Sequence, residues 1–403
     1  MEGLAPSMST TPGFQRSRLL LVLLAMLAAV SLCGCVAPNP ARDFGRMLRE
    51  HPDEGALIEG VPLPPPDPAN SGMAVLSSVL DYWNQPASPA AIQRWMESDG
   101  LKYSPEERLS RFAWSEGLWT HVQAGSLAAI RQRIRNGVPP VVVLQDRALD
   151  PYSARRAIVV GFDDRKDLVL CLEPPRRATA YAYSEFMTRW RAGREWMITF
   201  AKPEPARWPL DGQEHLSRAR FYEYRGDPTN AFADYSAALD AGLENSSLQV
   251  RIGNLHRTLG RSAQAEQAYR RALELDDHNG RAYNNLAYLL AEEDRSLDEA
   301  VALARQAMIL EPTNPMAMDT LGVALYRKGS FREASDVLER AQARARWLPD
   351  STRAEIGIHL ALAHAENQQP HLAREVLAHV LELDPHAVVP DTLKPLLDSS
   401  ASR

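Results

Sequence analysis

The chain has few cysteines, no excess of positive charge and a single long apolar run, and each shortage excludes a class of protein. Three cysteines in 403 residues cannot form a disulfide-rich scaffold. A formal net charge of −6 provides no basic field for counterion release, which argues against DNA or RNA as a partner. A mean hydropathy of −0.32 excludes a polytopic membrane protein. The 45% hydrophobic and 24% charged composition instead predicts two or three globular units.

The apolar run lies near the N-terminus. Arg16 and Arg18 precede an apolar stretch over residues 19–32, which is the order of an export signal, and the stretch is short for a membrane span. An uncleaved anchor helix or a plain secretory signal is the alternative interpretation.

The end of this run resembles the bacterial lipoprotein signal. Residues 32–35, Leu-Cys-Gly-Cys, place the small Gly34 directly before Cys35, whereas the bulky Leu32 precedes Cys33 and makes it the poorer candidate. We therefore predict a lipoprotein signal peptide over residues 1–34. The resemblance implies lipidation of Cys35 with palmitate-like chains and a lipid-anchored position at the cell outer membrane, facing the periplasm. Several acyl chains make such anchoring stable.

The mature chain begins with a Pro-rich segment, 35–66, that we predict to be an extended tether. Residues 67–201 mix two periodicities and predict an α+β domain. Its predicted elements are helices near 72–83, 89–98, 104–116 and 126–136 and strands at 140–144, 157–161, 169–172 and 196–200. Cys171, within an apolar run, is predicted to be an inert core thiol. Residues 202–211 contain several prolines and predict a linker.

The remaining sequence is Ala-rich and repeats with an offset of about 34 residues, because Gly253, Ala265, Tyr269 and Ala272 have equivalents in the neighbouring units. The predicted units are 212–245, 246–279, 280–314, 315–348 and 354–387, followed by a tail, 388–403. Each unit resembles a tetratricopeptide repeat, with small residues where its two helices meet. This part is therefore expected to be an all-α superhelix, because such units bury their apolar faces only by stacking.

Stacks of this kind present the first helix of each unit on a concave surface, which we expect to form a peptide-binding groove. The residues predicted to line it are Arg220, Glu223, Tyr224, Asn254, Arg257, Asn284, Tyr288, Asp319, Tyr326 and Arg327. Tyrosine, arginine and asparagine along one face are typical of a binding surface, although simple solvation is the alternative for any one of them. In the fifth unit the equivalent positions are Ile358, Leu362 and Ala365, and we expect the tail, with Val388 and Leu393, to cover that end.

The front domain resembles the papain-like cysteine peptidases that cut double-glycine leaders in bacteriocin exporters. Four short motifs carry this resemblance in order along about 130 residues: Ser71-Gly72 with the apolar and aromatic pattern to Trp83, Gly137-Val138-Pro139, the segment from Arg156 to Asp163, and Glu173-Pro174. It implies a papain-like α+β fold.

The family's catalytic groups are absent from the matching positions. Ser71, Arg156 and Glu173 stand where the family has cysteine, histidine and aspartate, and Pro65 stands at the oxyanion glutamine. Arginine stays protonated and cannot act as a base. The nearest histidines, His121 within this domain and His51 in the segment before it, lie elsewhere. We therefore expect a degenerate domain, more a pseudo-enzyme than an enzyme, in which Ser71 caps a helix and Arg156 pairs with Glu173.

The sequence therefore predicts an outer-membrane lipoprotein that binds a peptide or protein, as a binding or assembly factor, through a non-catalytic peptidase-like cleft and a tetratricopeptide groove. We expect no cofactor and no metal. One alternative is an active peptidase of the leader-processing type with an unconventional site. Another is a pure repeat scaffold for envelope assembly.

Overall fold

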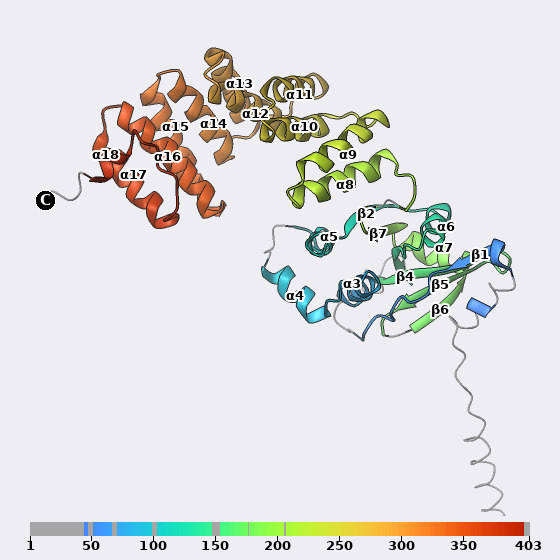
Figure 1. Ribbon diagram of the computed structural model, residues 1–403. Helices are drawn as coiled ribbons and strands as arrows, with labels where there is room; N and C mark the ends of the chain where they lie inside the picture. The colour runs from blue at the N-terminus through green and yellow to red at the C-terminus, as the bar shows by residue number, and fades with distance from the viewer. Residues whose placement is uncertain are drawn as a thin grey trace, which may run out of the picture. The chain divides into compact units, whose positions relative to one another are not determined.

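The computed structural model describes most of the chain. The described residues are 44–46, 51–66, 71–98, 103–146, 154–175, 177–204 and 207–398. The predicted signal peptide and Cys35 lie outside them. The chain divides into two compact units, Met1–Trp208 and Pro209–Arg403, each described below by itself (Figure 1). Within the described ranges, no helix is long and apolar enough to cross a membrane.

The first unit is built on a seven-stranded antiparallel sheet. The strand order is β2-β7-β3-β4-β5-β6, and β1 pairs with β4 beside this path. The strands are β1 (Gly55–Leu57), β2 (Trp119–Ala124), β3 (Val141–Gln145), β4 (Ala154–Asp163), β5 (Leu168–Glu173), β6 (Arg177–Ala182) and β7 (Trp196–Ala201).

Helices α3 to α7 of the described residues accompany the sheet. They are α3 (Ser71–Tyr82), α4 (Pro89–Ser98), α5 (Pro105–Ser115), α6 (Leu127–Arg135) and α7 (Tyr183–Ala192). The mixture of helices and an antiparallel sheet agrees with the α+β prediction. The sequence analysis missed β1, β2, β6 and α7. Strand β6 shows why, because only Tyr181 of its six residues is buried and its apolar pattern is correspondingly weak.

Alternate residues of the central strands face opposite sides of the sheet. Val142 and Val159 belong to a buried cluster with Trp190 of α7 and residues of α6, so these two helices cover one face. The intervening Val141 and Ile158 are also buried. They point to the opposite face, where α3 packs against β4 (Figure 1). The sheet is therefore apolar on both sides, and its core lies on both faces of β3 and β4.

The segment predicted to be a free tether contributes to this unit. Residues 55–57 form β1, in antiparallel register with β4. Ile58 is buried next to it, and Phe44 is buried where a β-carbon on Gly161 of β4 would lie 2.9 Å from its ring. The prediction of a tether extending to residue 66 is therefore wrong for this stretch. The prediction was wrong because the prolines of this segment suggested a tether and obscured the one short strand that lies between them.

The second unit consists of consecutive helix pairs, as the repeat predicted. The pairs are α8 (Gly212–Tyr224) with α9 (Pro228–Asp240), α10 (Ser246–Thr258) with α11 (Ser262–Leu275), α12 (Gly280–Glu292) with α13 (Leu297–Leu310), α14 (Pro315–Arg327) with α15 (Phe331–Arg344), and α16 (Asp350–Glu366) with α17 (Pro370–Leu383). The last pair begins at Asp350, one turn before the predicted start of its unit at residue 354. The first helices α10, α12, α14 and α16 pack on one another in succession.

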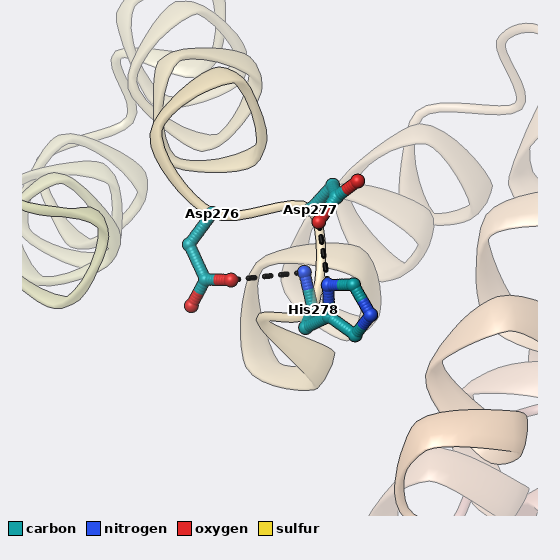
Figure 2. A group of neighbouring side chains, drawn as sticks. All are labelled: Asp276, Asp277 and His278. Atoms are coloured by element: carbon teal, nitrogen blue, oxygen red, sulfur yellow. Dashed lines mark hydrogen bonds and ion pairs between the residues drawn. The ribbon is translucent and has the colours of Figure 1, made fainter.

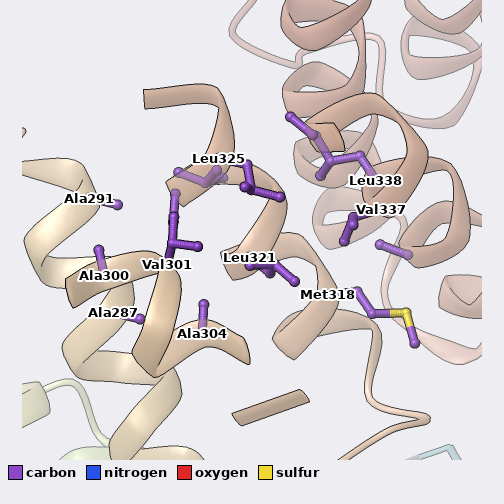
Figure 3. Close-up of a cluster of buried hydrophobic side chains, with 14 of the residues drawn as sticks. Ala287, Ala291, Ala300, Val301, Ala304, Met318, Leu321, Leu325, Val337 and Leu338 are labelled. Carbon is purple, nitrogen blue, oxygen red and sulfur yellow. The ribbon is translucent and has the colours of Figure 1, made fainter. Parts of the chain in front are cut away.

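Small residues allow the two helices of a pair to approach closely. Gly322 of α14 lies against Leu338 of α15, and a β-carbon at residue 322 would be only 2.3 Å from the leucine Cγ. Ala265 and Ala272 of α11 are fully buried. The core continues from pair to pair through alanines and branched residues, as Figure 3 shows for α12 to α15. Each pair therefore completes its core only with its neighbours.

The turn inside each pair contains at least one residue with a left-handed backbone. Gly226, Gly260 and Gly329 take this conformation in three of the pairs, where glycine adopts it without a steric cost. Asp294 and Gln368 take it in the other two, with φ of 50° and 62°. A left-handed residue is thus kept in the turn where the sequence supplies no glycine, and the turn between α12 and α13 has a second one, Ser296, with φ of 47°.

Of the two tail residues predicted to cover the last helix pair, one does so. Leu393 is fully buried in a cluster with Ala361 and Leu377, and the short helix α18 (Lys394–Asp398) follows it. Val388, in contrast, is 87% exposed. The prediction that the tail covers this end is confirmed for Leu393 and wrong for Val388.

Candidate functional site

The predicted groove residues lie on the first helices α8, α10, α12 and α14, where polar contacts link successive units. Arg251 Nη1 on α10 is 2.6 Å from Glu223 Oε2 on α8. The Oδ1 atom of Asn254 accepts hydrogen bonds from the Tyr269 hydroxyl at 2.8 Å and from Asn285 Nδ2 on α12 at 2.7 Å. These contacts hold neighbouring first helices in register.

Arginine and tyrosine side chains continue this row toward the third and fourth units. The Arg257 guanidinium lies 5.7 Å from the ring centroid of Tyr288, within the range of a cation–π contact, and 3.7 Å from Glu292. Burial raises the pKa of Tyr288, and the charge of Glu292 adds to the effect. Tyr288 is therefore a neutral phenol at physiological pH.

The outer ends of the row differ in their surroundings. Arg220 and Tyr224 are exposed on α8. Asn284 is half-buried and donates to Asn285 Oδ1 at 3.3 Å. Tyr326 is half-buried against Phe331, and Arg327 lies 3.4 Å from Asp294. The structure thus places these side chains along successive first helices.

Asp319 is the exception among the predicted groove residues, because it is a buried group and not a surface contact. It is 2% exposed, and its Oδ1 atom lies 2.9 Å from His359 Nδ1 of α16. Burial of His359 favours the neutral ring. The charge and hydrogen bond of Asp319, together with the charge of Glu355, outweigh that effect and raise the histidine pKa. The prediction failed here because the covering histidine comes from the next unit of the chain.

A pocket of about 200 Å³ opens beside this pair. It contains three predicted residues, Tyr288, Tyr326 and Arg327, and also Ile358 and Leu362 of the fifth unit. Its other lining residues are Glu292, Val323, Leu338, His359 and Pro390. Sequence reasoning missed Val323 and His359. Their register was the sequence signal that could have found them, because they lie on the helix faces that also carry Tyr288 and Ile358.

In the first unit, the structure does not bring Arg156 and Glu173, two of the expected catalytic positions, together. Glu173 on β5 is buried, and its Oε2 atom lies 2.6 Å from Arg155 Nε while its Oε1 atom accepts from the Tyr181 hydroxyl at 2.5 Å. Arg155 also contacts Asp146 at 2.6 Å. The partner of Glu173 is thus Arg155, and the predicted pairing with Arg156 is wrong.

The strand register explains this difference. Ile158 pairs with Leu172, so Glu173 lies opposite residue 157 and shares a face with Arg155, whereas Arg156 points to the other face. Arg156 lines a hollow with Ser104 and Trp196, to which Arg155 also contributes. Burial and the hydrogen bond to Glu173 raise the pKa of Tyr181 to about 12, which keeps the phenol a donor.

The remaining residues of the expected site are dispersed. Helix α3 begins at Ser71, whose side chain lies outside the described part of the structure, so its capping role stays a prediction. His121 is buried on β2, opposite Thr199, and three strands from β4 in the sheet. Cys171 is fully buried, and burial raises the pKa of its thiol. The prediction of a core thiol at this position is confirmed.

A cluster of metal-binding residue types occurs in the turn between α11 and α12. Asp276, Asp277 and His278 lie together and are all exposed (Figure 2). His278 Nδ1 is 2.5 Å from Asp277 Oδ1, and the backbone N–H of His278 donates to Asp276 Oδ1 at 3.0 Å. These contacts explain the cluster as a hydrogen-bonded turn.

The comparisons with known proteins identify the second unit. Residues 250–315 match the family model of the tetratricopeptide repeat. The C-terminal region therefore contains tetratricopeptide repeats, and the chain combines such a superhelix with an N-terminal region built on an antiparallel sheet. No curated protein matches the chain.

Several solved structures resemble the chain over less than half its length. The Cut9-Hcn1 tetramer of the APC/C matches at 18% identity and a TM-score of 0.41, over 47% of this chain and 36% of that one. MamA from Desulfovibrio magneticus RS-1 matches at 16% identity and a TM-score of 0.38, over 43% of this chain and 95% of that one. PilW, a type IV pilus biogenesis factor, matches at 19% identity and a TM-score of 0.39, over 46% of this chain and 82% of that one.

Proposed function

We propose that this protein is a binding or assembly factor whose tetratricopeptide groove holds a segment of a protein partner. The observation that carries the proposal is the row of tyrosines and arginines on successive first helices, in which Tyr288 and Tyr326 are half-buried and which ends in the pocket between α12, α14 and α16. Tyrosine and arginine are the residue types that contribute most to binding at protein interfaces. A rigid row built on packed helices also loses little conformational freedom on binding.

Site-specific crosslinking tests this proposal. A photoreactive phenylalanine analogue replaces Tyr288 or Tyr326 in the full-length protein in its own cells, and the adducts are mapped by mass spectrometry. The control places the same analogue at Arg340, an exposed position on the second helix α15. We expect one defined partner segment from the two groove positions and none from residue 340. Adducts of equal yield and identity at all three positions would contradict a groove-specific role.

The proposal includes an anchor at the membrane. We propose that Cys35 carries lipid and holds the folded units on the periplasmic side of the outer membrane, supported by the charged, apolar and small-residue order of the first 35 residues. Cys35→Ser should abolish acylation and leave precursor or released protein. Cys33→Ser is the matched control and should be acylated normally. Full membrane recovery and acylation of Cys35→Ser would remove this part of the proposal.

For the first unit, we propose a peptidase-like domain that serves binding or support rather than hydrolysis. Both carboxylate oxygens of Glu173 are already engaged, one by Arg155 and one by Tyr181. Glu173 is therefore held by Arg155 and Tyr181, on the face of the sheet opposite Arg156. Incubating the protein with a library of peptides and with thiol- and serine-directed activity probes tests this. Cleavage or labelling that Ser71→Ala abolishes would favour the peptidase alternative.

A further inference from the structure

The pocket between α12, α14 and α16 has the dimensions of a single side chain. Its volume of about 200 Å³ is below the roughly 300–1,000 Å³ of sites for drug-sized ligands. Val323, Leu338, Ile358 and Leu362 form apolar walls, and Pro390 of the tail closes one side. An aliphatic or aromatic side chain therefore fits this pocket better than a polar group, which would lose its hydration without a full set of partners.

Carboxylates outnumber cations around the pocket. Arg257 lies 3.7 Å from Glu292, and Arg327 lies 3.4 Å from Asp294, so each guanidinium already faces an acid. His359 is engaged with the buried Asp319. The cations near the pocket are thus already matched by acids of this chain.

Two further carboxylates, Glu355 and Glu366, lie on α16 and are exposed. Among the described residues, neither forms an ion pair within 4 Å. Both lie one helical turn from residues that line the pocket, Glu355 before His359 and Glu366 after Leu362. Their charges add to the effect of burial in raising the pKa of Tyr288 and of Tyr326, respectively. The rim of the pocket therefore carries a net negative field.

We propose that this pocket binds one apolar side chain of a basic peptide segment, with lysine or arginine flanking the apolar residue. This inference rests on the proposed function and specifies the chemistry of the partner. The apolar side chain contacts Val323 and Leu362, and the flanking cations face Glu355 and Glu366, with Glu292, which lines the pocket, shared between Arg257 and the peptide. Complementary charge of this kind chiefly sets specificity and the rate of association.

An array of short synthetic peptides tests the inference with the full-length protein. The central residue is leucine, phenylalanine or serine, and the flanking residues are lysine, glutamine or glutamate. We expect the strongest binding for leucine or phenylalanine between lysines, with binding that weakens as salt is added. The triple variant Glu292→Gln, Glu355→Gln, Glu366→Gln should weaken it by about tenfold, because several half-exposed ion pairs are removed together.

Two variants separate the roles of charge and shape. The control triple Glu274→Gln, Glu375→Gln, Glu382→Gln removes the same charge from exposed positions on the second helices and should leave binding unchanged. Val323→Thr keeps the shape of the pocket but adds a hydroxyl, and should weaken leucine peptides while leaving the fold intact. Equal losses in the two glutamate triples would overturn the inference, since they would indicate only a change of overall charge.

The array also distinguishes this inference from the function on which it rests. A groove that captures a defined partner segment by crosslinking, but prefers acidic or purely polar peptides, would overturn the basic, apolar specificity and keep the binding function. No peptide binding, together with no groove-specific crosslink, would overturn both.

Discussion

Tyr269 lies so close over Gly253 that a β-carbon at residue 253 would be 2.4 Å from its Cε1 atom. The tyrosine is fully buried, and its hydroxyl donates to Asn254 one residue along the opposite helix. One aromatic ring therefore fixes both the spacing of α10 and α11 and the orientation of a groove residue. The same contact therefore determines both the packing inside the pair and the orientation of Asn254 on the predicted binding surface.

Gly253→Ala should consequently destabilise the repeat unit, although alanine is the better helix former. The added methyl group would force the ring of Tyr269 to move, at a cost of about 1–3 kcal/mol for overpacking. Urea unfolding of the full chain measures the change. Thr258→Ala, at an exposed position of the same helix, is the control and should change stability by less than about 0.5 kcal/mol.

Ala272→Leu is expected to act in the same way from the second helix. Ala272 is fully buried beside Val250 and Ala282, so the larger side chain has no space, and we expect a loss of roughly 1–3 kcal/mol. Gln267→Leu, on the exposed side of α11, provides the control. A melting curve of Ala272→Leu that matches the wild type would contradict the packing described for this pair.

Two turns of the array should become more stable when glycine is introduced. Gln368 and Asp294 have the left-handed backbone that Gly226, Gly260 and Gly329 adopt in the other turns. For a residue with a β-carbon this conformation costs about 1–2 kcal/mol. Gln368→Gly should therefore raise the melting temperature, and Gly260→Gln, the reverse exchange, should lower it. A lower melting temperature for Gln368→Gly would contradict this account.

The pair formed by the partly buried His359 and the buried Asp319 should make stability depend on pH. Because the folded-state pKa of His359 is raised, the charged pair contributes its full stability below about 6.5, the pKa of a free histidine, and loses it as pH rises through the folded value. His359→Gln should thus be most destabilised at low pH and approach the wild type at high pH. His278→Gln, at an exposed histidine, is the control for the loss of a histidine elsewhere in the repeats. Urea titrations at several pH values measure both.

In the first unit, Arg155→Leu should leave Glu173 buried without its cation. Loss of one member of such a pair costs about 3–5 kcal/mol. The double variant Arg155→Leu, Glu173→Leu removes both charges and should recover much of that loss. A thermal melt of the three proteins decides the matter, and equal destabilisation of the single and double variants would contradict a charge-pair origin.

The repeats were predictable because their information is local and periodic. The glycines, alanines and plug residues recur at a spacing that only one helical pairing satisfies, as Gly322 and Leu338 illustrate. The contacts that the sequence did not reveal are those set by distant residues. Asp319 is buried by His359, which lies 40 positions later. The partner of Glu173 depends on a register difference of one residue between β4 and β5, which no apolar pattern records.

Leu393 has a consequence for self-assembly. A stack of helix pairs has no intrinsic end, because the surface that receives one more pair remains apolar after the last one. Here the tail folds back and inserts Leu393 among Ala361, Ala373 and Leu377, so that surface is covered by the chain itself. A copy truncated after residue 387 would expose an apolar face on which another helix can pack. Filaments or aggregates would then grow from that face. By covering this face, the tail prevents further helix pairs from adding at the C-terminal end of the stack.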